Sequence, residues 1–196
     1  AYWGLRELRQ PLFETIISYI ISANNSVPLI SRSIDFLCRK WGQPIEVNGA
    51  TFYTFPEPSE IDCISEAELA FVTRIGFRAK YIKKVVRDIL SGRFDPNCLH
   101  SAEQPDACEL LQTLHGVGPK VADCVSLFAL GQDHVVPFDV WMRRIFVQVY
   151  GQPATAKYSD LQNFARQYFG EYAGWAHQFL FMYSRQHGVE KLKSAG

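Results

Sequence analysis

The sequence predicts an all-α fold, and three observations support this prediction. Apolar residues recur every three or four positions along most of the chain, which is the period of a helix with one buried face. Glycine and proline gather mainly between these periodic segments, where they favour turns. Val135 and Val136 are too short a run for a sheet. We therefore expect helices joined by turns, in one domain or two small lobes, for these 196 residues.

Two amphipathic helices are expected first. Residues 13–21 carry Phe13 and four isoleucines at helical spacing, and residues 30–41 repeat an apolar stripe. Gly42 suits the C-terminal cap of the second helix. Residues 43–59 contain three prolines and are predicted to form a loop.

A short helix and a longer basic helix follow. Ser65 and Glu68 have the spacing of a capping box, which opens the short helix. Gly76 interrupts it, and residues 78–91 continue as a basic helix that Gly92 ends. Further helices are expected near residues 140–150, 159–168 and 172–186.

The most informative segment is ELLQTLHGVGPKVADCVSLFALGQDHVVPFD, residues 109–139. It predicts a helix, a glycine-rich hairpin and a second helix over about residues 106–130. A short connecting segment follows, and it ends at the carboxylate of Asp139. Gly116 and Gly118 allow a sharp turn and close approach of a partner. Pro119 suits the first position of the second helix. Backbone N–H groups at such a turn form an anion site suited to a DNA phosphate.

Composition excludes several classes of protein. The chain is 47% apolar, yet no run of about 18 apolar residues could span a membrane. The N-terminus lacks the pattern of a signal peptide. The five cysteines are odd in number and form no CxxC pair, so we expect reduced thiols and neither a zinc ribbon nor a disulfide framework.

The charge distribution is uneven, although the net charge is zero. Residues 57–68 hold five carboxylates and no base, whereas residues 71–93 hold seven bases against Asp88 alone. This basic stretch could face DNA phosphates, or it could be an ordinary solvated helix face.

The chain resembles the helix-hairpin-helix DNA glycosylases, and most closely their 8-oxoguanine DNA glycosylase branch. The resemblance rests on LxGVGxKVADC and VPxD in the central segment, and on the SANNS, GFRAKY and YAGWA blocks in the family's order. It covers nearly the whole chain and implies two helical lobes flanking a DNA-binding cleft. It also implies a base-excision-repair enzyme that flips a damaged purine out of duplex DNA, excises it and nicks the abasic strand.

The resemblance assigns the chemistry to Lys120 and Asp139. A neutral lysine amine can attack the sugar C1′ and form a Schiff base. A fixed carboxylate can stabilise the cationic sugar of the transition state. Two plainer interpretations stay open: Lys120 could pair with a DNA phosphate, and Asp139 could simply cap the next helix.

The resemblance also implies two groups of binding residues. The extrahelical base would lie between Cys124 and Phe181, with His177 at the position where mammalian relatives read the base edge with a glutamine. Cys124 and Phe181 could each instead be ordinary core packing, and His177 could equally be a buried or a surface histidine. Asn24 and Arg78 would hydrogen-bond the base left unpaired, and Phe77 would wedge into the emptied stack; the alternative for Asn24 is a helix cap. The hairpin residues Gly116, Val117 and Gly118 would hold a DNA phosphate.

Cofactors and partners follow from the same resemblance. No cofactor is expected to be required, although hairpin carbonyls could hold a monovalent cation, and no cysteine after Cys124 could complete an iron–sulfur site. The expected partner is damaged double-stranded DNA, with no membrane, bound by a monomer inside the cell, in the bacterial nucleoid or cytoplasm or the eukaryotic nucleus. The family's N-terminal β-rich domain is absent from these residues, so residues 1–196 are expected to be one glycosylase domain.

Two other functions stay open. One is a glycosylase for another damaged base, such as an alkylated purine; enzymes of that kind often lack a lysine at the position of Lys120. The other is a helix-hairpin-helix module that binds DNA without catalysis, which would need the glycine hairpin but not the pair of Lys120 and Asp139.

Overall fold

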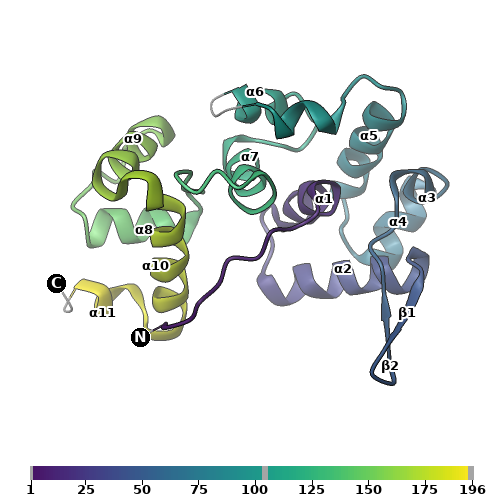
Figure 1. Ribbon diagram of the computed structural model, residues 1–196, viewed down its shortest axis with the longest axis horizontal. Helices are drawn as coiled ribbons and strands as arrows, with labels where there is room; N and C mark the ends of the chain where they lie inside the picture. Colours follow the sequence, from purple (N-terminus) through teal and green to yellow (C-terminus); the bar gives the residue numbers. More distant parts are fainter. Residues whose placement is uncertain (1, 103–105, 194–196) are drawn as a thin grey trace. The chain divides into compact units, whose positions relative to one another are not determined.

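The computed structural model describes residues 2–102 and 106–193 (Figure 1). It confirms the all-α prediction, with one small hairpin added. The chain divides into two compact units, in agreement with the expectation of two helical lobes. We call Pro11–Val121 the N-terminal unit, and Ala122–Gly196 together with Ala1–Gln10 the C-terminal unit.

The N-terminal unit is built from helices and one β-hairpin. Its elements are α1 (Leu12–Ser22), α2 (Val27–Trp41), β1 (Pro44–Val47), β2 (Ala50–Tyr53), α3 (Pro58–Asp62), α4 (Glu66–Thr73), α5 (Arg78–Leu90), the 3₁₀ helix η1 (Pro96–His100), α6 (Asp106–Gln112) and the start of α7 (Pro119–Val125).

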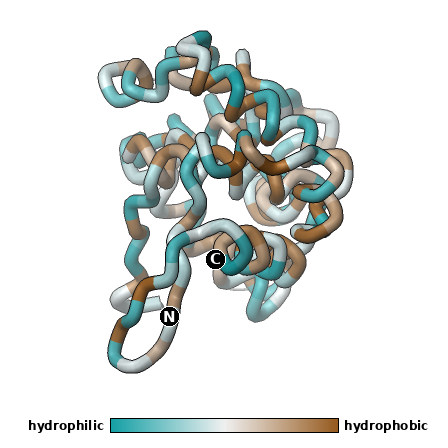
Figure 2. The backbone as a smooth tube through the Cα atoms, turned by 90° about the vertical axis from the view of Figure 1, so that its right-hand side faces the viewer, coloured by the Kyte–Doolittle hydropathy of each residue, from teal (hydrophilic) through white to brown (hydrophobic). Residues whose placement is uncertain are grey.

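Helix α1 supplies the centre of the N-terminal unit. Ile16, Ile17, Ile20 and Ile21 are fully buried and form one stripe at helical spacing. This stripe packs against α2 and α5, which bring apolar faces of their own. Along the helices of Figure 2, apolar and polar residues alternate in the same way.

The loop predicted over residues 43–59 is wrong in its first half. Pro44 pairs with Tyr53 and Val47 with Ala50 in an antiparallel hairpin. Asn48 and Gly49 form the turn with φ of 51° and 78°, which is the left-handed geometry that a two-residue hairpin favours. The three prolines favoured a loop, but the Asn-Gly pair supplies the turn that a hairpin needs.

The C-terminal unit continues α7 and adds the remaining helices. Its elements are the π-helical η2 (Ser126–Leu130), α8 (Val140–Gln148), α9 (Tyr158–Phe169), the 3₁₀ helix η3 (Gly170–Tyr172), α10 (Ala173–His187) and α11 (Val189–Lys193).

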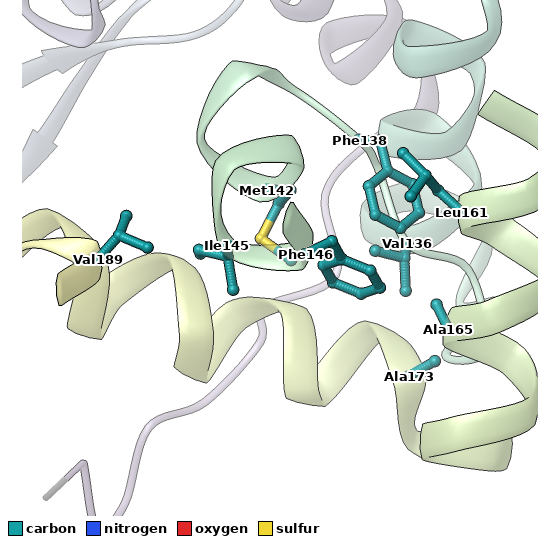
Figure 3. Packing of buried hydrophobic residues seen from close by; sticks show 9 residues of the cluster. All are labelled: Val136, Phe138, Met142, Ile145, Phe146, Leu161, Ala165, Ala173 and Val189. Atoms are coloured by element: carbon teal, nitrogen blue, oxygen red, sulfur yellow. The ribbon is translucent and has the colours of Figure 1, made fainter. Parts of the chain in front are cut away.

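The core of this unit lies around α8. Met142, Ile145 and Phe146 are fully buried, and their side chains point toward α10 in Figure 3. Phe138, from the segment before α8, meets Phe146 edge-to-face with ring centroids 4.7 Å apart. Helix α8 and the segment before it are therefore held by one apolar cluster.

The glycine of the YAGWA block has a packing role. A Cβ at Gly174 would lie 2.4 Å from Leu127 Cδ1 and 2.7 Å from the carbonyl oxygen of Asp133. Gly174 N–H donates to that carbonyl over 2.6 Å. Only glycine lets α10 approach the segment after η2 so closely.

No helix within residues 2–102 and 106–193 is long and apolar enough to cross a membrane.

Candidate active site

The predicted hairpin joins α6 to α7 through a tight turn. Val117 N–H donates to the Leu114 carbonyl over 3.2 Å, which closes the turn. Gly116 has a φ of +85°, and a Cβ there would lie 2.9 Å from the Cβ of Tyr81. The turn therefore requires glycine at this position for both its backbone geometry and its packing.

Gly118 differs from Gly116. Its φ is not in the left-handed region, and a Cβ there would meet nothing within 4 Å. The fold of the free protein does not demand glycine here, so the residue leaves open space beside the turn. As predicted, α7 begins at Pro119.

Lys120 is half-buried on the first turn of α7. Its Nζ lies 5.1 Å from the centre of the Tyr19 ring, on α1. At this distance the ring attracts the ammonium group and limits where the side chain can point. Tyr19 was missed from the sequence; the available signal was an aromatic residue beside the buried isoleucine stripe of α1.

Cys124 follows Lys120 by one helical turn, so the two positions lie on the same face of α7. Its thiol is reduced and the residue is 3% exposed. A buried cysteine of this kind packs as a small apolar group.

Asp139 caps α8, as predicted. Its Oδ1 accepts a hydrogen bond from Met142 N–H over 2.8 Å. The residue is half-buried, next to the exposed Val140. Capping therefore fixes the carboxylate at the start of α8 without burying it completely.

His177 and Phe181 form a stacked pair on α10. Their rings are 6.0 Å apart at the centroids with an interplanar angle of 18°. His177 is 7% exposed, so the interpretation as a surface histidine is wrong. The guanidinium carbon of Arg185 lies 5.7 Å from the centre of the Phe181 ring. Because the two rings are nearly parallel, they form an aromatic surface on which another planar ring could stack.

Asn24, Phe77 and Arg78 lie together in the N-terminal unit. Asn24 is exposed in a left-handed turn with φ of 50°, which asparagine tolerates. Arg78 Nε donates to the Ala23 carbonyl over 2.8 Å, and Arg78 Nη2 donates to the Asn24 carbonyl over 3.0 Å. Phe77 is 55% exposed and lies 4.7 Å from the Arg78 guanidinium. Arg78, only 8% exposed, therefore supports the turn that presents Asn24.

The basic stretch of residues 71–93 does not form one basic face. Arg78 and Lys83 are buried, and Lys83 Nζ donates to the carbonyls that end α3. Lys84 and Arg93 both pair with the buried Asp88, over 2.6 and 3.0 Å. Much of this charge is therefore engaged within the unit, while Arg74, Lys80 and Arg87 stay exposed.

In the part of the chain that the structure describes, no group of three His, Cys, Asp or Glu side chains could hold a metal ion.

The fold and these residues define a helix-hairpin-helix protein. A model of the HhH-GPD superfamily base excision DNA repair proteins matches residues 17–171. The chain belongs to this superfamily.

Three relatives illustrate the similarity. The chain is 36% identical over 207 residues to a probable N-glycosylase/DNA lyase of Methanothermobacter thermautotrophicus, covering 95% of this chain and 65% of that protein. The structure of MBOgg1 in complex with a low-affinity DNA ligand has a TM-score of 0.89 and 40% identity, over 94% of this chain and 63% of that one. The Clostridium acetobutylicum 8-oxoguanine glycosylase/lyase, in complex with double-stranded DNA containing cytosine opposite 8-oxoguanine, has a TM-score of 0.88 and 34% identity, over 93% and 62%. The chain spans less than two thirds of the length of each.

The two hairpin glycines should respond differently to alanine. Gly116→Ala should destabilise the free protein, because a left-handed non-glycine residue costs about 1–2 kcal/mol before the clash with Tyr81 is counted. Gly118→Ala should change the free energy of unfolding by less than about 0.5 kcal/mol. The prediction that this turn holds a DNA phosphate adds that both substitutions should weaken binding to damaged and undamaged duplexes alike, because phosphate contacts carry no sequence information.

Urea unfolding and duplex-binding titrations measure the two effects. Equal destabilisation by both substitutions would contradict the geometry of the turn. A selective loss of lesion binding would contradict the phosphate contact.

Proposed function

We propose that the chain is the glycosylase domain of a base-excision-repair enzyme that removes a damaged purine, chiefly 8-oxoguanine, from duplex DNA and then nicks the abasic strand. The observation that carries this proposal is the position of Lys120. The residue follows the glycine turn directly, on the first turn of α7, in a chain of the HhH-GPD superfamily. A hairpin that only binds DNA needs the turn but not the pair of Lys120 and Asp139.

The proposed reaction begins with the Lys120 amine. Its lone pair forms a bond to the sugar C1′ while the bond from C1′ to the base breaks, and the electron pair of that bond leaves with the base. Opening of the sugar then gives a Schiff base on Nζ. Loss of a C2′ proton and cleavage of the C3′–O bond break the strand. The ring of Tyr19 favours a limited range of side-chain positions for this attack.

In the first step Asp139 stabilises the transition state through its negative charge. As the glycosidic bond breaks, the sugar gains positive charge, and a preorganised carboxylate stabilises that charge most in the transition state. Because the Met142 N–H holds one carboxylate oxygen, the group needs little reorganisation.

Two sets of side chains bind the lesion site. The extrahelical base lies between Cys124, which packs against it, and Phe181, which stacks on it. His177 hydrogen-bonds the edge of the base. Asn24 contacts the orphaned partner base while Phe77 fills the emptied stack. Arg78 acts on that partner through the turn it supports, and its direct contact with the base requires the bonds to the Ala23 and Asn24 carbonyls to be exchanged.

The hairpin of Gly116, Val117 and Gly118 holds a phosphate of the duplex. The open space at Gly118 supports close approach of the DNA backbone. The carbonyl oxygens of this turn also bind a monovalent cation, because oxygen atoms are the ligands that such ions prefer. The reaction itself needs no further cofactor, because the lysine is the nucleophile. The domain acts as a monomer on DNA inside the cell.

A panel of single-lesion duplexes tests the substrate. Single-turnover rates of base release are compared for 8-oxoguanine, guanine and an alkylated purine in the same sequence. The proposal expects 8-oxoguanine to be released fastest. Faster release of the alkylated purine would reassign the substrate, and binding without any release would identify a non-catalytic module.

Lys120→Gln should abolish base release while lesion binding stays within about threefold. Glutamine keeps polarity and similar length but cannot form a Schiff base. The matched control is Lys40→Gln, an exposed lysine in the last turn of α2, which should release base at the original rate. Normal release by Lys120→Gln would show that another group attacks the sugar.

Asp139→Asn should slow base release by about 10²–10³, the usual effect of losing one transition-state electrostatic interaction. Thermal stability should fall little, because asparagine is also a good helix cap. Calorimetry and single-turnover rates separate the two effects. A collapse of stability with normal turnover of the remaining folded protein would make the carboxylate purely structural.

A further inference from the structure

A buried carboxylate on α7 has no part in the function proposed above. Asp123 lies between Ala122 and Cys124 and is 1% exposed. Its Oδ2 accepts hydrogen bonds from the Tyr158 hydroxyl and the Gln162 amide, both from α9. Tyr158 and Gln162 are one turn apart, so α9 presents both donors to the same oxygen.

The same two side chains hold the segment that leads to Asp139. Gln162 Nε2 also donates to the Val136 carbonyl over 2.7 Å. The Tyr158 hydroxyl accepts from the Phe138 N–H over 3.2 Å. These bonds hold the backbone on both sides of Pro137, whose ring already fixes its φ.

The directions of these hydrogen bonds fix the orientation of the Tyr158 hydroxyl. The Tyr158 hydroxyl donates to Asp123 and accepts from Phe138, so it cannot rotate without losing one bond. Burial, followed by the Asp123 carboxylate, raises the pKa of Tyr158 far above its ordinary value. The phenol therefore stays protonated and keeps donating at any ordinary pH.

A need for stability alone does not account for this arrangement. A buried charged group contributes little net stability compared with apolar residues of the same size. What the network adds is a defined backbone position. Tyr158 links Asp123 to Phe138, the residue just before Asp139, and Gln162 links Asp123 to Val136. A misplacement of about 1 Å can cost about 100-fold in rate.

We propose that Asp123, Tyr158 and Gln162 are positioning residues that hold the Val136–Phe138 backbone so that Asp139 stabilises the transition state. This inference rests on the proposed function, because it assigns the network an effect on base release through Asp139.

The decisive variant is Tyr158→Phe. It removes one hydroxyl, keeps the ring that meets Phe138 edge-to-face, and leaves the Phe138 N–H without its acceptor. Single-turnover base release at saturating enzyme should slow by about 10- to 100-fold. Affinity for the lesion duplex should stay within twofold. The matched control is Tyr150→Phe, a half-buried tyrosine in the aromatic cluster of the same unit, which should release base at the original rate.

A double mutant identifies the route of the effect. In an Asp139→Asn background, Tyr158→Phe should slow base release by less than about twofold, because the group that the network positions has already been removed. A full additional 10-fold loss in that background would overturn the proposal, as would an unchanged rate for Tyr158→Phe alone.

A second variant tests the proposal if Tyr158→Phe folds poorly. Gln162→Met keeps the length of the side chain, removes the amide that bonds Asp123 and the Val136 carbonyl, and should give the same slow release with the same dependence on Asp139. A normal rate in folded Gln162→Met would also overturn the proposal. Failure of the proposed function looks different, because the unsubstituted chain would then release no base, or Asp139→Asn would release it at the normal rate.

Discussion

The left-handed turn at Gly116 is the constraint on which the candidate site depends. Its φ of +85° and its contact with Tyr81 exclude a side chain, so the end of α6 and the start of α7 are fixed relative to each other. Pro119 then starts the helix and Lys120 falls on its first turn, against the Tyr19 ring. One glycine thus determines where a lysine amine stands in the N-terminal unit.

Helix α7 combines three kinds of chemistry within five residues. Lys120 carries a half-buried amine, Asp123 a buried carboxylate in a hydrogen-bond network, and Cys124 a buried thiol. Asp123 and Cys124 are adjacent and point in different directions, whereas Cys124 lies one turn after Lys120 on the same face. Through Tyr158 and Gln162, hydrogen bonds tie Asp123 to the segment before Asp139.

Helical periodicity predicted the long helices well, because burial of one apolar stripe dominates their formation. Asp139 was also predicted to cap α8, since capping is local in sequence. The Asn48–Gly49 hairpin was missed despite a local signal. Neither the inward turn of Arg78 nor the network of Asp123 could be predicted, because their partners lie about 55 and 35 residues away and only tertiary structure joins them.

Mapping the covalent intermediate tests the central claim most directly. Reduction with borohydride during reaction with a lesion duplex would fix the Schiff base, and mass spectrometry of the digested protein would locate it. Attack by the held lysine of the hairpin predicts a single modified peptide, with the sugar remnant on Lys120. Attachment to a different amine, or base release with no trapped protein at all, would contradict it.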